Sequence, residues 1–94
     1  MSLENEYIKE TVENDMRLLQ PLGRDMVDGS IIETYSLDGL ILSYAVHKPY
    51  RHLIVRGDLN QDTAFDLLEH FHFDPKRPVE YEKKGNQHTY FQRV

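Results

Sequence analysis

The sequence contains no cysteine and no tryptophan, and it has only five glycines and four prolines among 94 residues. Without cysteine, the chain has no disulfides, thiolate zinc sites, iron–sulfur clusters or cysteine nucleophiles. Its apolar runs are short, as in Leu40-Ile41-Leu42, and none could span a membrane or form the core of a signal peptide. We therefore expect a cytoplasmic protein that does not contact a membrane.

The sequence has fewer basic than acidic residues: 11 Lys and Arg against 16 Asp and Glu, which give a formal net charge of -5. General nucleic-acid binders usually carry a basic excess, so the total charge argues against that class. The charges are unevenly placed: acidic residues dominate positions 1–28, whereas none occurs from Gly39 to Gly57. Such asymmetry permits association between copies or a local site for an anionic ligand.

Two segments have the periodicity of amphipathic helices. The first is predicted over 3–19, with Ser2 as its cap, and its apolar positions are Ile8, Val12, Met16 and Leu19. Pro21 and Gly23 should end it, because proline disfavours helical backbone in the residue before it. The second helix is predicted over 61–73, with Asn60 as its N-cap, and its apolar stripe comprises Ala64, Phe65, Leu68 and Phe71.

The remaining segments predict a sheet. Asp38-Gly39 is a two-residue turn signal that predicts a hairpin of strands 30–37 and 40–46, in which Leu37 faces Leu40 and Tyr35 faces Leu42. Further strands are expected over 53–56, 79–84 and 88–93. We predict one α+β domain over 1–94, a two-layer sandwich with a mainly antiparallel five-stranded sheet, two helices on one face, and the order α-β-β-β-α-β-β. As a fold-level analogy, this order resembles that of small secretion chaperones, which are acidic, dimeric and non-enzymatic.

Alternation along these strands divides the apolar residues between two faces. The face under the helices is expected to carry Ile31, Tyr35, Leu37, Leu40, Leu42, Val46, Leu53 and Val55. The opposite face retains four apolar residues among polar ones: Ile32, Ile41, Ala45 and Ile54. Scattered surface apolar residues are common, but four on one face can form a contiguous association surface. We therefore expect a protein–protein interaction module that forms a homodimer through these residues and also binds an unidentified protein.

The alternative is a protein that binds single-stranded nucleic acid or another anionic ligand. Aromatic side chains on a sheet can stack on bases while Lys and Arg contact phosphates. The residues that could do so lie in the basic middle of the chain: Lys48, Tyr50, Arg51, His52 and Arg56. A second such group comprises Tyr81, Lys83, Lys84 and Tyr90. Tyr81 and Tyr90, like Tyr35 and Tyr44, are more economically placed in the core or its rim.

No arrangement typical of catalysis or metal binding is visible. His70 and His72, two positions apart on a predicted helix, would point to nearly opposite sides and could not chelate one ion. His47 and His52 share a predicted face with Ser43, but as bases they would need a carboxylate to orient them. We expect no enzymatic activity, no cofactor and no metal.

No other motif in the sequence indicates a specific function. The chain has no phosphate-binding loop and no dinucleotide-binding glycine motif. Arg56-Gly57-Asp58 matches a tripeptide that adhesion receptors bind, but it reads as a strand end and a turn. Glu80 and Glu82 are expected to form surface ion pairs rather than an acid–base pair.

Overall fold

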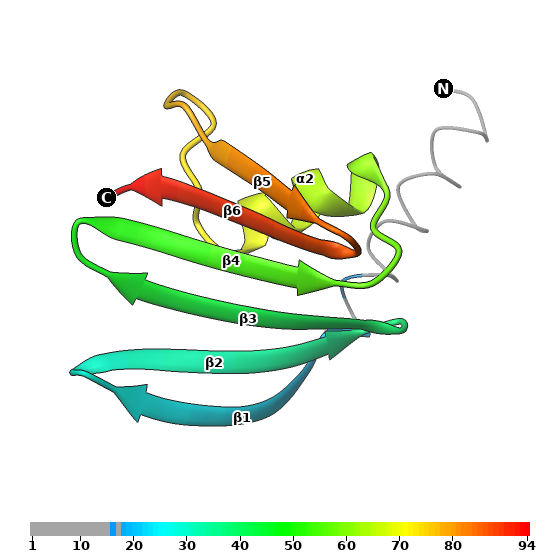
Figure 1. The fold of residues 1–94 in the computed structure, drawn as a ribbon. Coiled ribbons are helices and arrows are strands. Elements are labelled where there is room, and N and C mark those ends of the chain that lie inside the picture. Colours follow the sequence, from blue (N-terminus) through cyan, green and yellow to red (C-terminus); the bar gives the residue numbers. More distant parts are fainter. Residues whose placement is uncertain (1–15, 17) are drawn as a thin grey trace, which may run out of the picture.

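The computed structural model of the protein describes residues 16 and 18–94. They form a small α+β domain with six strands and one helix: β1 (Gln20–Val27), β2 (Ser30–Leu37), β3 (Leu40–His47), β4 (Tyr50–Arg56), α2 (Gln61–His70), β5 (Glu80–Lys84) and β6 (Gln87–Arg93). All strands pair antiparallel in one sheet of order β1-β2-β3-β4-β6-β5 (Figure 1). The predicted class is confirmed, but the predicted number of five strands is wrong. The described order differs from the predicted one because a strand precedes the predicted hairpin. Most of the helix predicted over 3–19 lies outside the described residues.

The additional strand is β1, which occupies residues that follow the helix predicted over 3–19 and that we assigned to no strand. It is joined to β2 by Asp28-Gly29, whose φ angles of 50 and 80° are those of a two-residue hairpin turn. Pro21 and Gly23 are accommodated by a shift of register between them, a β-bulge at the outer edge of the sheet. Every residue of β1 is exposed, so the strand lacks the apolar alternation by which strands are predicted.

The hairpin of β2 and β3 has the predicted register. Leu37 pairs with Leu40 and Tyr35 pairs with Leu42, and Asp38 and Gly39 between them have φ angles of 44 and 85°. The turn thus sets which side chains lie on each face, because a slip of one residue would exchange the two faces.

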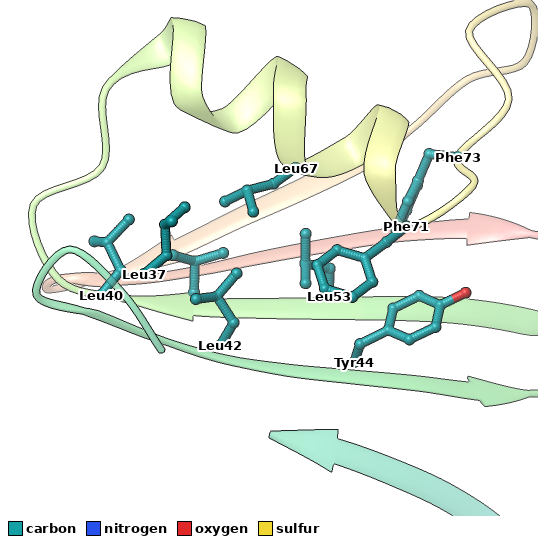
Figure 2. Packing of buried hydrophobic residues seen from close by; sticks show 9 residues of the cluster. Leu37, Leu40, Leu42, Tyr44, Leu53, Leu67, Phe71 and Phe73 are labelled. Carbon is teal, nitrogen blue, oxygen red and sulfur yellow. The ribbon is translucent and has the colours of Figure 1, made fainter. Parts of the chain in front are cut away.

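The core lies between α2 and the face of the sheet that carries Leu42 and Leu53 (Figure 2). Leu67 and Phe71 point from the helical side toward these strands, and both strand leucines have no exposed surface. The covering layer is incomplete. Ile31 and Val46, which we predicted to lie under helices, are 39% and 37% exposed, because the described helix has only 10 residues and packs over the other part of the sheet.

The helix begins at its predicted cap and ends three residues early. The Asn60 side chain accepts a hydrogen bond from the Thr63 N–H at 2.8 Å, which satisfies one of the free N–H groups of the first turn. The predicted end at Phe73 is wrong, because Phe71 already leaves helical geometry and His72 has a φ of 67°. The reversal directs both Phe71 and Phe73 into the core.

Candidate interaction surfaces

The four residues predicted to form an interface lie together on the side of the sheet away from α2, which we call the outer face. Ile32 pairs with Ala45, and Ser43, between Ile41 and Ala45 on β3, pairs with Ile54. Residues paired across strands share a face, and diagonal neighbours are also within reach of one another. Ile41 is 43% exposed and the other three are partly buried. In Figure 1, α2 passes behind the strands, and no other described element covers the outer face.

Aromatic rings extend this apolar area toward the turn between β3 and β4. His52 stacks on Phe91 with ring centroids 6.1 Å apart, and Tyr50 meets both rings edge-on at 6.1 and 6.5 Å. We call these three residues the aromatic cluster. Tyr50 and His52 were predicted to lie on one face, but Phe91 was not grouped with them. Local alternation does not show that β6 joins the sheet beside β4.

Charged residues of both signs surround the apolar area. The register places three cations and three carboxylates on the outer face: Arg56, Lys84, Arg93, Asp25, Glu80 and Glu82. Two of them are paired, with Lys84 Nζ 3.5 Å from a carboxylate oxygen of Glu82. Because the two signs balance, the outer face has no net charge, which differs from the basic surface that nucleic-acid binding requires.

The predicted anion-binding residues do not all lie together, and the grouping of Arg51 with the others is wrong. Tyr50, His52 and Arg56 lie on the outer face, and Lys48 lies in the adjoining turn. Arg51 lies on the opposite face because β4 already begins at Tyr50, three residues earlier than predicted, and alternation turns the next side chain inward. There its guanidinium donates a hydrogen bond to the His72 carbonyl and lies 5.9 Å from the centre of the Phe73 ring.

The remaining candidate residues are dispersed. Nδ1 of His47 lies 2.6 Å from the Ser30 hydroxyl, whereas His52 stacks within the aromatic cluster. His70 lies edge-on to Phe71 at 5.0 Å. Within residues 16 and 18–94, no three His, Asp or Glu side chains are grouped as ligands for a metal ion. In the second predicted basic and aromatic group, Lys84 lies on the outer face, and the other three lie on the helix side: Tyr81, Lys83 and Tyr90.

A second surface, not predicted from the sequence, lies beside α2. Two adjoining cavities of about 330 and 620 Å³ share Phe65 and Leu68 of the helix as lining residues. We call this pair of cavities the helix groove. The smaller cavity is also lined by three aromatic residues of β5 and β6: Tyr81, His88 and Tyr90. The larger one is closed by residues of the segment between α2 and β5: Phe73, Asp74, Pro75, Arg77 and Val79.

The aromatic wall of the groove is held by a polar contact. The Tyr81 hydroxyl lies 2.7 Å from Nδ1 of His88, a residue that is only 7% exposed, and the two rings stack. Tyr90 packs on Tyr81 with ring centroids 4.8 Å apart. Burial, and to a smaller extent the neighbouring Tyr81, raise the pKa of Tyr90 above its ordinary value. This wall therefore consists of packed aromatic rings that the contact between Tyr81 and His88 holds in place.

Comparison with known proteins found no matching family model, no matching curated protein and no matching solved structure. In the part of the chain that the structure describes, no helix has the length and apolar character needed to cross a membrane.

Proposed function

We propose that the protein is a protein–protein interaction module that forms a homodimer through its outer face. The observation that carries the proposal is the position of Ile32, Ile41, Ala45 and Ile54 around Ser43 on a sheet face that no described element covers. Removing such an apolar area from water favours association. The aromatic cluster adjoins it and adds large side chains of the kind that are enriched at interfaces.

The size of the face suits a second copy of the chain. The sheet has six strands, and strands about 4.8 Å apart with about seven residues at roughly 3.4 Å each cover about 600 Å². Two such faces in contact would bury about 1,200 Å² in total, which is the lower limit for a stable specific interface. The balanced charges at its margins allow one copy to face another without excess repulsion.

The oligomeric state of the full chain tests the proposal. We expect sedimentation or light scattering to show a dimer, and Ile41→Asp to weaken it by at least about tenfold, because a carboxylate in an apolar contact loses its hydration. Met26→Asp is the matched control, since Met26 is 72% exposed on the opposite side of the sheet. A protein that stays monomeric at high concentration, or an Ile41→Asp variant that associates like the unmodified chain, would contradict the proposal.

A second candidate function is the binding of a single-stranded nucleic acid or another anionic ligand. It is favoured by a cavity of about 270 Å³ in which Tyr50 and Phe91 meet Arg77 and Arg93. Rings beside guanidinium groups can hold a base and a phosphate together. The balanced charge of the outer face and the inward position of Arg51 make this candidate the weaker of the two.

Fluorescence polarisation with a labelled oligonucleotide tests this second candidate function. Binding should be strongest at low salt and should be weakened by Arg93→Glu. Arg24→Glu serves as the control, because Arg24 lies on β1 near Glu33, away from the cavity. Absence of binding at low salt excludes this candidate.

A further inference from the structure

The helix groove combines a continuous apolar lining with an exposed aromatic side chain. Phe65 is 59% exposed although it lines both cavities, and Leu68 beside it lines both as well. Across from them lie Phe73 and Val79 in the larger cavity. Volumes of about 330 and 620 Å³ lie within the range of pockets that bind ligands. A segment with two neighbouring apolar anchors would therefore fill the groove and cover Phe65.

The charge beside the groove is mainly negative. Residues 57–75 contain five carboxylates and no lysine or arginine: Asp58, Asp62, Asp66, Glu69 and Asp74. Glu69 and Asp74 line the larger cavity directly, where Arg77 is the one lysine or arginine among the lining residues. An apolar groove with an acidic margin complements a partner that carries apolar residues between cationic ones.

We propose that the helix groove binds a positively charged amphipathic segment of a partner protein. Its apolar side chains pack against Phe65 and Leu68, and its lysine or arginine side chains lie along Glu69 and the acidic exposed side of α2. This is helix-in-groove recognition, in which anchors three or four positions apart enter neighbouring cavities. The groove lies on the helix side of the sheet, so this inference is independent of homodimer formation through the outer face.

A synthetic helical peptide of leucine and lysine, with leucines at helical spacing, serves as the probe. We expect fluorescence polarisation to show binding that weakens as salt is raised, and a companion peptide with glutamate in place of lysine to bind at least about tenfold more weakly. Phe65→Ala should weaken binding of the lysine peptide by at least about fivefold, as expected for an aromatic anchor. Met26→Ala, an equally simple truncation of an exposed residue on β1, should leave it unchanged.

Replacing acidic residues of α2 with lysine gives a test whose expected result differs from the effect of unfolding. Asp62→Lys combined with Glu69→Lys should weaken the lysine peptide and strengthen the glutamate peptide, because both residues are exposed on α2. When the lysine peptide is added to the unmodified protein, the NMR chemical shifts of backbone amides in α2 and β5 should change.

Three results would overturn the proposal: equal binding by the Phe65→Ala and Met26→Ala variants, equal affinity for the two peptides, or shift changes confined to the outer face. Loss of the protein's own association in Phe65→Ala would assign the groove to a second copy and would also overturn it. Homodimer formation is measured separately with Ile41→Asp, so failure of one proposal does not decide the other.

Discussion

Gln92 holds the backbone of Asp74 by both polar atoms of its side-chain amide. Its Oε1 accepts a hydrogen bond from the Asp74 N–H at 2.7 Å, and its Nε2 donates to the Asp74 carbonyl at 2.8 Å. On the neighbouring strand, Arg51 pairs with Gln92 and donates to the His72 carbonyl. Two central strands therefore fix the segment that forms one wall of the helix groove.

Gln92→Leu should lower the free energy of unfolding by about 2–3 kcal/mol, because it leaves partly buried backbone polar groups of Asp74 without partners. Urea denaturation measures the change. Gln87→Leu on the same strand is the control: Gln87 accepts one exposed hydrogen bond from Arg56, and its loss should cost less than about 1 kcal/mol. Equal costs for the two variants would mean that the contact with Asp74 contributes little.

Gly57→Ala should destabilise the protein by about 1–3 kcal/mol, because φ there is 129°, in a region that side chains avoid. An added Cβ would also lie 2.8 Å from Cδ2 of the buried Leu40. Gly23→Ala is the matched control, since no atom lies within 4 Å of its Cβ position. In thermal unfolding, Gly57→Ala should have a lower melting temperature than Gly23→Ala. Similar melting temperatures would contradict the claim that the backbone at residue 57 requires glycine.

Two substitutions on α2 test how the helix packs. Leu67→Ala should cost about 2–5 kcal/mol, because the side chain has no exposed surface and its removal leaves a cavity. Phe65→Ala, two positions earlier and largely exposed, should cost less than about 1 kcal/mol. Denaturant unfolding of both variants checks the prediction, and a larger loss from Phe65 would place that residue in the core.

Stability should fall at alkaline pH in part through Tyr90. Burial, and then Tyr81, raise its folded-state pKa above the ordinary value of 10.0, so the folded protein favours the neutral phenol. The contribution is complete below pH 10.0 and is lost as pH rises through the folded pKa, because the unfolded chain deprotonates first. The urea concentration at the midpoint of unfolding is measured below and above this pH. It should fall more steeply with rising pH for the unmodified protein than for Tyr90→Phe. Identical slopes would rule out this residue as a cause.

The parts of the fold that the sequence predicts best are those set by local turn geometry. The Asp38-Gly39 turn determines the register of β2 and β3, and with it the placement of Leu42 in the core and Ile41 on the outer face. Asp28-Gly29 is also a two-residue hairpin turn. The strand before it was not predicted, because β1 is exposed throughout and Pro21 is typical of the end of a helix.

Features that depend on distant segments could not be predicted in this way. Phe91 joins Tyr50 and His52 only because β6 pairs with β4, a neighbour relation that no local pattern contains. Arg51 was predicted to lie outside the strand, because β4 begins at Tyr50, before the first of its apolar residues. The helix groove depends on where the segment after α2 returns to the sheet, and this return is set by the buried contacts of Gln92.

The two borders of the sheet have a consequence for how copies of the chain can join. At one border, Pro21 lacks a backbone N–H and the bulge beside it distorts the edge of β1. At the other, four of the five residues of β5 are charged. Both features oppose the addition of further strands. Open-ended growth into amyloid-like fibrils is therefore disfavoured, even though no described element covers the outer face of the sheet.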